Sequence, residues 1–232
     1  MANLKTITKI FNDVAGSYDL TNRILTFCLD LHWRSRAAAH AARFGGNLWL
    51  DVCSGTGDMA IELRRKACGD VRIIAADICP SMLDAARKKA KRKNIEFKTA
   101  DSKNLPFKDN SVDLITISFA TRNLNAGRDE LAGYFREFFR VLKPGGRFIN
   151  LETSRPESRL AGFVLFTYAR IFIEPVGYLV SGSRTAYRYL SHTIRHFYSA
   201  EELAGIMREA GFKKAGYFYL TFGLCAVHTS EK

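Results

Sequence analysis

The sequence predicts an α/β fold built on a mostly parallel sheet of seven strands, with helices on both faces and an antiparallel hairpin near the end of the chain. Apolar runs alternate with helical patterns through the first two-thirds of the chain, and strands joined by helices need right-handed crossovers that make them parallel. Two further apolar runs, Lys213–Leu220 and Leu224–His228, follow with only a few residues between them. That gap is too short for a helical crossover, so these two strands are expected to pair antiparallel.

The parallel part of the sheet is expected to contain five strands. They are predicted at Leu48–Cys53, Arg72–Asp77, Ile95–Thr99, Val112–Ser118 and Arg147–Leu151. The helices between them are predicted at Asp58–Lys66, Ser81–Lys93 and Asp129–Val141. Pro144-Gly145-Gly146 follows the last of these helices, and is expected to end it and to start the fifth strand.

Two more helices are predicted outside this alternation. Ser199–Ala210 begins with Ser199 three residues before Glu202, which is the pattern of a capping box, and it ends at Gly211. An alanine-rich stretch, Asp30–Phe44, is the helix candidate of the N-terminal part.

We expect one domain over residues 1–232, because this length can bury a full core and no internal repeat or low-complexity stretch divides the chain. Residues 1–45 are expected to form a helical cap. Residues 154–197 form an aromatic, apolar and basic insertion between the fifth strand and the last helix. Insertions at the carboxyl edge of such sheets commonly cover the ligand crevice, so this one is expected to lie over the active site.

The composition is that of an ordinary globular protein, with 47% hydrophobic and 25% charged residues. The five cysteines are scattered without a C-x-x-C pair, which argues against a disulfide framework or a zinc site and fits a reducing cytoplasm. Residues 1–11 lack the apolar core of a signal peptide. We therefore expect a cytoplasmic protein.

The formal net charge of +12 admits a nucleic-acid partner or an anionic membrane surface. Its densest run, Arg87–Lys93, has no interleaved aromatic residues for base stacking, which favours a solvated helix end. The most apolar window, Leu160–Val180, contains Arg170, Glu174 and Pro175, and is therefore a poor membrane span.

A nucleotide-type ligand site is predicted at Leu50–Asp58, where a buried strand runs into a glycine turn that opens a helix. Gly55 and Gly57 remove side chains where the backbone bends tightly, and the N-terminus of the following helix points unpaired N–H groups at the same place. The pattern suits a nicotinamide, a flavin or S-adenosylmethionine, and a purely structural turn stays an alternative. Asp51 and Thr56, within this motif, are predicted to contribute to the site.

Polar residues also stand at the ends of the next strands. Asp77 ends the second strand, twenty positions after Gly57, where a carboxylate can accept hydrogen bonds from both ribose hydroxyls. Its alternative role is to cap the following helix. Asp101 and Ser102 follow the third strand, where Asp101 could accept from the amino group of an adenine, and Ser118 ends the fourth. Their convergence on one sheet edge is more specific than any single motif.

The glycine turn and the polar strand ends together resemble a class I S-adenosylmethionine-dependent methyltransferase, a class of enzyme with a Rossmann-like fold. More narrowly, the chain resembles the ubiquinone/menaquinone biosynthesis C-methyltransferase family. The narrower resemblance rests on Tyr18-Asp19-Leu20-Thr21-Asn22-Arg23, Phe119-Ala120-Thr121-Arg122-Asn123-Leu124 and Tyr187-Arg188-Tyr189-Leu190 with Ile194-Arg195. Departures from the family pattern, among them Ala120, Cys53-Ser54 and Arg155, leave the identity of the quinone open.

The resemblance implies methylation of a ring carbon of a reduced, prenylated quinone, of the demethylmenaquinol-to-menaquinol type, with S-adenosylmethionine as cofactor and no metal. It implies Arg122 and Asn123 as catalytic residues and Tyr18 and Tyr187 as substrate-binding residues. Arginine stays protonated at ordinary pH and cannot serve as a free base, so Arg122 would stabilise a developing phenolate or orient a water. A structural salt bridge is its alternative role.

The partners implied are the prenylated quinol and, transiently, an anionic membrane at its inner face, with no nucleic acid expected. Three other functions stay open at this point. They are a methyltransferase acting on another small molecule, a methyltransferase acting on RNA, and a nucleotide-binding protein without catalysis.

Overall fold

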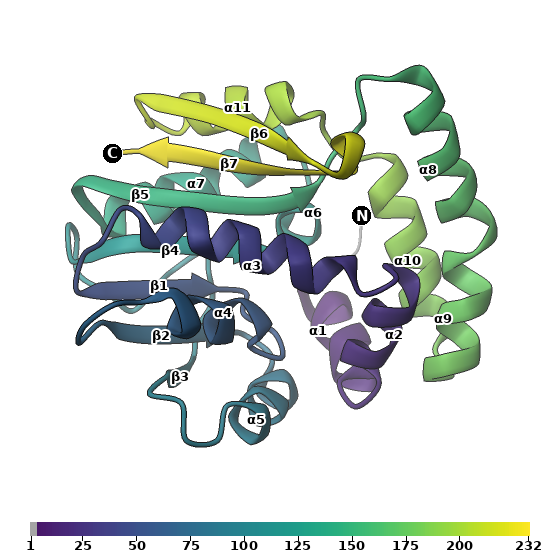
Figure 1. The fold of residues 1–232 in the computed structure, drawn as a ribbon, viewed down its shortest axis with the longest axis horizontal. Coiled ribbons are helices and arrows are strands. Elements are labelled where there is room, and N and C mark those ends of the chain that lie inside the picture. The colour runs from purple at the N-terminus through teal and green to yellow at the C-terminus, as the bar shows by residue number, and fades with distance from the viewer. Residues whose placement is uncertain (1–3) are drawn as a thin grey trace.

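In the computed structural model, which describes residues 4–232, a single sheet of seven strands runs through the centre of the molecule (Figure 1). The strands are β1 (Leu48–Val52), β2 (Arg72–Asp77), β3 (Glu96–Thr99), β4 (Val112–Ser118), β5 (Leu142–Thr153), β6 (Lys214–Leu220) and β7 (Cys225–Glu231). Their order is β3-β2-β1-β4-β5-β7-β6. The first five pair in parallel, whereas β7 pairs antiparallel with both β5 and β6, which confirms the predicted sheet.

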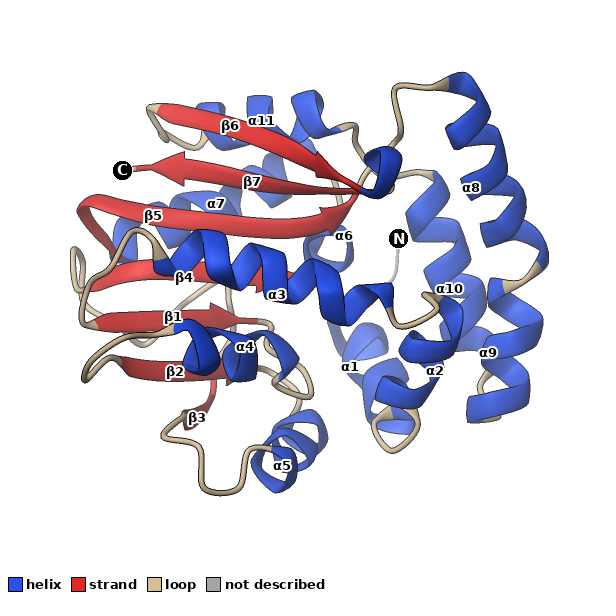
Figure 2. Cartoon of the chain, in the orientation of Figure 1, coloured by secondary structure: helices blue, strands red, loops and turns tan. Residues whose placement is uncertain are grey.

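Helices cover both faces of the sheet, as predicted (Figure 2). The helices before β5 are α1 (Leu4–Val14), α2 (Tyr18–Leu25), α3 (Leu29–Ala42), α4 (Asp58–Lys66), α5 (Pro80–Lys89), α6 (Thr121–Leu124) and α7 (Arg128–Val141). Those after it are α8 (Arg159–Ile171), α9 (Ile173–Ser181), α10 (Arg184–Arg195) and α11 (Ala200–Glu209), with a short 3-10 turn η1 (Thr221–Gly223).

Side chains of successive strand residues alternate between two cores, because the side-chain period of a strand is two. Ile73 and Ala75 of β2 belong to the core under α3 and α4, whereas Ile74 and Ala76 belong to the core under α7 and α11. A third apolar core joins α1, α2 and α8–α10 with the start of α5. These helices gather at the carboxyl ends of β1, β2 and β4, on the right in Figure 1.

Two predicted boundaries are wrong. The helix expected over Ser81–Lys93 ends at Lys89, and Arg92 lies in the left-handed region with φ +66°, so the last part of the basic run is a turn. Pro144-Gly145-Gly146 lies inside β5 rather than before it. The register of β5 on β4 shifts between Val112 and Leu114, and Gly145 takes φ +78°, so the three residues form an irregularity within the strand.

No single helix among residues 4–232 is long and apolar enough to cross a membrane. Gly162–Ile171 and Ile173–Ser181 pass that test of length and composition only as a pair bent by 40°.

Gly177 allows α9 and α10 to approach closely. A Cβ atom at this position would lie 2.0 Å from Cγ of Tyr187, which is buried in the third core. Gly177→Ala is therefore expected to push the two helices apart and to lower the free energy of unfolding by about 1–3 kcal/mol, measured by urea unfolding. Gly162→Ala in α8 is the matched control, because its Cβ would meet only the ring of Phe166, at 4.0 Å. Equal losses in both variants would contradict the expectation.

Candidate active site

A cavity with an empty volume of about 860 Å³, including the part open to solvent, lies at the carboxyl ends of β1, β2 and β4. We call it the polar cavity. The residues predicted from sequence that line it are Gly55, Thr56, Asp77, Asp101, Ser102, Ser118, Asn123 and Tyr18. The predicted convergence of strand ends is therefore present in the structure.

The two glycines of the turn serve different purposes. Gly55 lines the polar cavity with φ +55°, and a Cβ atom there would meet nothing within 4 Å, so its backbone stays open to a ligand. Gly57, with φ +79°, is not among the residues lining this cavity, and its Cβ would lie 3.0 Å from Cβ of Ala86. Gly57 is therefore required for packing of the loop on α5.

Asp77 ties the glycine turn to the loop after β2. Its Oδ2 accepts a hydrogen bond from the Gly55 N–H at 2.8 Å, and its Oδ1 accepts one from the Cys79 N–H, also at 2.8 Å. Burial raises the pKa of this carboxyl, although the backbone N–H groups oppose the shift. A carboxylate has about four acceptor sites, so two remain for hydroxyl groups of a ligand. The structure thus places Asp77 both at the entry to α5 and in the cavity wall.

The next strand ends supply further polar groups. Asp101 Oδ1 accepts from the Lys103 N–H at 2.9 Å. The side chain of Ser102 is buried, with Oγ 3.6 Å from Sγ of Cys53. Cys53 and Phe119, at the ends of neighbouring strands, both adopt positive φ, of 50° and 55°. Such backbone strain is common where a fold holds a functional site.

Asp51 lies beneath the glycine turn and is not among the residues lining the polar cavity. It is fully buried, and Thr116 Oγ1 donates to its Oδ1 at 2.7 Å, while no residue of the described chain bonds its Oδ2. Burial raises the pKa of this carboxyl to about 6.

The shift at Asp51 predicts a pH dependence of stability. A carboxyl with a higher pKa in the folded protein than in the unfolded chain contributes stability at low pH that is lost as the pH rises through its folded pKa. Between about pH 4 and 6, the free energy of unfolding of the wild type is expected to fall by about 2–3 kcal/mol relative to Asp51→Asn. Urea unfolding of both proteins across this range measures the difference. A difference that stays constant with pH would contradict the assignment.

A second, apolar cavity adjoins the first between α2, α3 and α8–α10. Its empty volume is about 1,100 Å³, again including space open to solvent. Its apolar lining includes Leu25, Phe27, Trp33, Val164, Leu165, Tyr168, Ile173, Leu190 and Ile194. Tyr18, Arg34 and Phe119 line both cavities, so they mark the junction between them.

The two larger cavities divide the predicted catalytic pair between them. Asn123 lines the polar cavity, whereas Arg122 lines the apolar one. Arg122 is buried and forms an ion pair with Glu152, which also accepts a hydrogen bond from the Arg122 backbone N–H at 3.2 Å. Burial disfavours the charge of Arg122, but Glu152 outweighs this effect and holds the pKa of Arg122 above its ordinary value. Arg122 therefore forms a buried salt bridge and at the same time faces the apolar cavity.

The two predicted substrate residues meet at a third, smaller cavity. Tyr18 is at the junction of the cavities. Tyr187 is only 3% exposed and packs in the third core. It lines neither larger cavity, but borders the smaller one, of about 390 Å³, together with Tyr18, Arg122 and Asn123.

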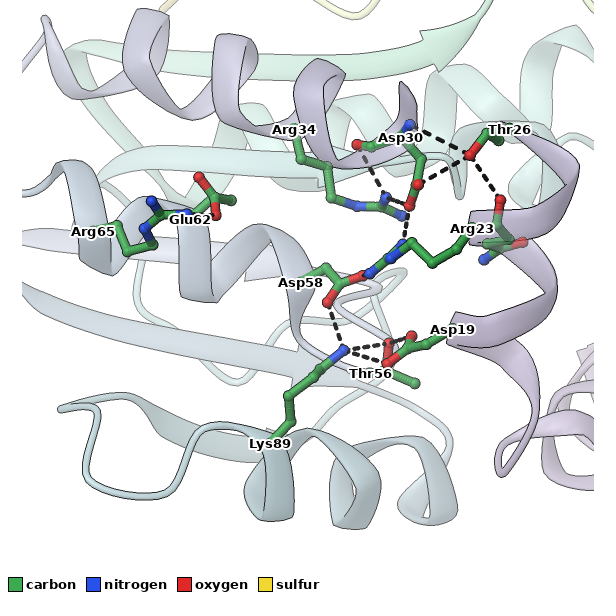
Figure 3. A network of polar contacts seen from close by, with 11 residues as sticks. Asp19, Arg23, Thr26, Asp30, Arg34, Thr56, Asp58, Glu62, Arg65 and Lys89 are labelled. Atoms are coloured by element: carbon green, nitrogen blue, oxygen red, sulfur yellow. Dashed lines mark hydrogen bonds and ion pairs between the residues drawn. The ribbon is translucent and has the colours of Figure 1, made fainter. Parts of the chain in front are cut away.

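Polar contacts hold the N-terminal helices over the glycine turn (Figure 3). Lys89 of α5 places Nζ 2.6 Å from Asp19 Oδ2 and 2.5 Å from Asp58 Oδ1. Asp19 also accepts from the Thr56 hydroxyl at 2.6 Å. Arg23 bridges Asp58, at the start of α4, and Asp30, at the start of α3.

This network contains cavity residues that were not predicted from the sequence. Asp58 and Arg34 both line the polar cavity. Burial alone would raise the pKa of Asp58, but Arg34 and Lys89 outweigh it and hold that pKa below its ordinary value. Arg34 lies within the helix predicted from its alanines, and nothing in that local pattern shows that its side chain points inward. Within residues 4–232 no group of three or more His, Cys, Asp or Glu is placed to hold a metal ion.

The family model described as the ubiE/COQ5 methyltransferase family matches residues 1–232. The chain belongs to this family. This methyltransferase is 40% identical to the demethylmenaquinone methyltransferase of Deinococcus radiodurans over 228 residues, which cover 97% of this chain and 92% of that protein. It is 35% identical to the ubiquinone/menaquinone biosynthesis C-methyltransferase UbiE of a Marinomonas species, over 99% of this chain and 91% of the relative.

A solved structure, a SAM dependent methyltransferase from Aquifex aeolicus, superposes on this methyltransferase with a TM-score of 0.57. The two sequences are 20% identical, and the match covers 81% of this chain and 85% of the Aquifex chain. The likeness supports the Rossmann-like methyltransferase fold expected from the sequence.

Proposed function

We propose that this methyltransferase moves the methyl group of S-adenosylmethionine to a ring carbon of a reduced, prenylated quinone, of the demethylmenaquinol-to-menaquinol type. The observation that carries the proposal is the junction of two unlike cavities, one lined by carboxylates and a glycine turn, the other large and apolar. The names of the two relatives support the choice of acceptor.

The residues of the polar cavity fit S-adenosylmethionine. Asp77 keeps two acceptor sites for the ribose hydroxyls, and Asp101 keeps one carboxylate oxygen for the adenine amino group. Gly55 leaves its backbone open beside them, and Thr56, Ser102 and Ser118 complete the polar wall. Asp51 and Gly57 support the turn from outside the cavity lining. When bound, the cofactor supplies an electrophilic methyl group on a sulfonium.

The chain's own residues prepare the acceptor in the apolar cavity. Trp33, Phe119 and Tyr168 line this cavity and exclude water from the reacting ring. Arg122, whose Nε bonds to no residue of the described chain, faces the same space and favours the phenolate form of the quinol. The phenolate makes the ring carbon electron-rich, while Asn123 and Tyr18 position the two reactants near the junction.

We propose that the whole chain acts as one domain, in which residues 1–45 form a cap and residues 154–197 cover the acceptor. Residues 1–3 of the cap lie outside the described part of the chain. α8–α10, within the second segment, supply one wall of the apolar cavity.

Purified protein tests the function directly. Incubated with S-adenosylmethionine and chemically reduced demethylmenaquinone, it is expected to yield a quinone that carries one more methyl group, detected by mass spectrometry. In cells lacking the protein, the demethylated quinone should accumulate. Binding of S-adenosylhomocysteine without transfer to any quinol would reject the acceptor but keep the cofactor.

The acceptor's apolar tail points to a membrane as its source, and we propose that the surface around α2, α8 and α9 rests on an anionic bilayer. Large apolar side chains are exposed there, namely Leu20, Ile24, Phe27, Leu160, Phe163, Val164, Ile171, Phe172, Tyr178 and Leu179. Phe27 and Val164 also line the apolar cavity. Arg159 and Arg170 are exposed on α8 and complement anionic headgroups, whereas Arg184 and Arg188 of α10 pair with Glu174.

Sedimentation with vesicles containing anionic lipid tests this surface. The double variant Phe163→Ser/Leu179→Ser is expected to lose most vesicle binding, because these side chains are 69% and 85% exposed. Phe44→Ser is the matched control, since Phe44 is 39% exposed just beyond the far end of α3. Undiminished binding by the double variant would reject this surface.

A further inference from the structure

We propose that Arg34 binds the α-carboxylate of the methionine portion of the cofactor and thereby sets where the transferred methyl group lies. The inference rests on the proposed use of S-adenosylmethionine in the polar cavity. It assigns a binding group to a residue of α3 that lies outside the glycine turn and the strand ends.

Arg34 stands at the junction of the two cavities. It is 5% exposed and lines both of them. The residues that line the polar cavity in the described chain include three carboxylates, Asp58, Asp77 and Asp101, and a single arginine or lysine, which is Arg34. A ligand carboxylate in this cavity therefore finds its complementary side-chain charge at this position.

The guanidinium of Arg34 is incompletely satisfied. Its Nη1 donates to Asp30 Oδ2 at 2.6 Å, but its Nε is buried and bonds to no residue within the described range. Asp30 also pairs with Arg23, which in turn pairs with Asp58 (Figure 3). The guanidinium of Arg34 lies over the ring of Phe119, with its Cζ 4.9 Å from the ring centroid, at the junction of the two cavities. Buried donors that no protein group accepts are rare in native proteins, and a bound ligand is one source of the missing acceptor.

The chemistry of the cofactor matches this unsatisfied guanidinium. If Asp77 held the ribose and Asp101 the adenine, the amino-acid portion would have to lie away from β2 and β3. Arg34 lies on α3, which packs on β5 and β4 on the other side of β1. A planar guanidinium offers two parallel N–H groups to a carboxylate, a geometry that fixes position as well as affinity. Held there, the methionine portion places its sulfur close to the apolar cavity.

Isothermal titration of the full chain with two ligands tests the assignment. S-adenosylhomocysteine carries the amino-acid portion, whereas 5′-methylthioadenosine has the same adenine, ribose and sulfur without it. Arg34→Gln is expected to raise the Kd for S-adenosylhomocysteine about tenfold to a hundredfold. The Kd for 5′-methylthioadenosine should stay within about twofold of the wild type, because that ligand has no carboxylate.

Two further variants complete the test. Arg36→Gln changes an exposed arginine of the same helix and should leave both affinities unchanged. Arg34→Lys keeps the positive charge beside Asp30 but loses the two parallel N–H groups of the guanidinium. It should therefore weaken binding of S-adenosylhomocysteine, though less than Arg34→Gln does, and leave binding of 5′-methylthioadenosine unchanged. This variant provides the test if Arg34→Gln does not fold.

Each contrary result has a distinct meaning. Equal losses for both ligands would assign Arg34 to the fold, and an unchanged Kd for S-adenosylhomocysteine would remove it from the site. Both results overturn the inference while leaving the proposed function intact. A wild-type protein that binds neither ligand would overturn the proposed cofactor and the inference with it.

Discussion

Replacing Glu152 with glutamine is expected to lower the free energy of unfolding by about 3–5 kcal/mol, which is the usual cost of leaving a buried charge without its partner. The side chains of Glu152 and Arg122 are 0% and 7% exposed, so water cannot compensate the arginine. Arg122→Met should cost a similar amount, because it leaves the carboxylate unpaired. Urea unfolding measures both losses.

A double variant separates the structural role of this pair from its role in catalysis. Arg122→Met/Glu152→Leu replaces both charges by apolar groups, and should recover most of the lost stability. Turnover should remain low in the double variant, because the cation that faces the apolar cavity is still missing. Wild-type turnover in the double variant would make the pair purely structural.

An exposed ion pair provides the control for the stability measurement. Arg128 and Glu209 form one in which the side chains are 46% and 52% exposed. Glu209→Gln should leave the unfolding curve unchanged, because water replaces the lost contact.

Replacing Asp77 with asparagine is expected to weaken S-adenosylhomocysteine binding at least about a hundredfold, since each hydrogen bond to a charged group contributes about 1.5–3 kcal/mol. Two such bonds to the ribose would be lost or weakened. The amide NH₂ would also face an N–H group, from either Gly55 or Cys79, so the glycine turn would shift. Isothermal titration measures the change in Kd.

Asp84→Asn is the control for Asp77, because Asp84 is an exposed carboxylate on α5 whose side chain pairs with Arg87 on the same helix. It should bind S-adenosylhomocysteine as the wild type does. Unchanged affinity in Asp77→Asn would restrict Asp77 to holding the loops together.

Much of the fold follows from local patterns. Residues at strand ends can be grouped from the sequence alone, because parallel topology brings the carboxyl ends of β1, β2, β3 and β4 to one edge. Gly55, Asp77 and Asp101 do lie around one cavity, as this grouping predicts. Pro144-Gly145-Gly146 was predicted to precede the fifth strand but lies inside it. Residues that disfavour a strand locally do not reveal that the hydrogen bonding of the sheet continues on both sides of them.

The roles of individual site residues were less predictable. Asp51 and Gly57 belong to the same motif as Gly55, yet one lies beneath the turn and the other packs on Ala86. Tyr187 belongs to a segment that resembles the family, but its ring fills the space left by Gly177. Motif membership alone does not distinguish a residue that contacts a ligand from one that supports its neighbour.

The sequence by itself determined the seven strands, the helices that join the parallel ones, the glycine turn and the carboxylates that follow the strands. These features depend on side-chain periodicity and on backbone preferences within a few residues. Only the tertiary structure decided that Arg34 lines both cavities, that Glu152 pairs with Arg122, and that α8–α10 complete an apolar cavity beside the polar one. Those contacts join residues far apart in the chain, and they arise from how helices pack on the sheet edge, which no local pattern encodes.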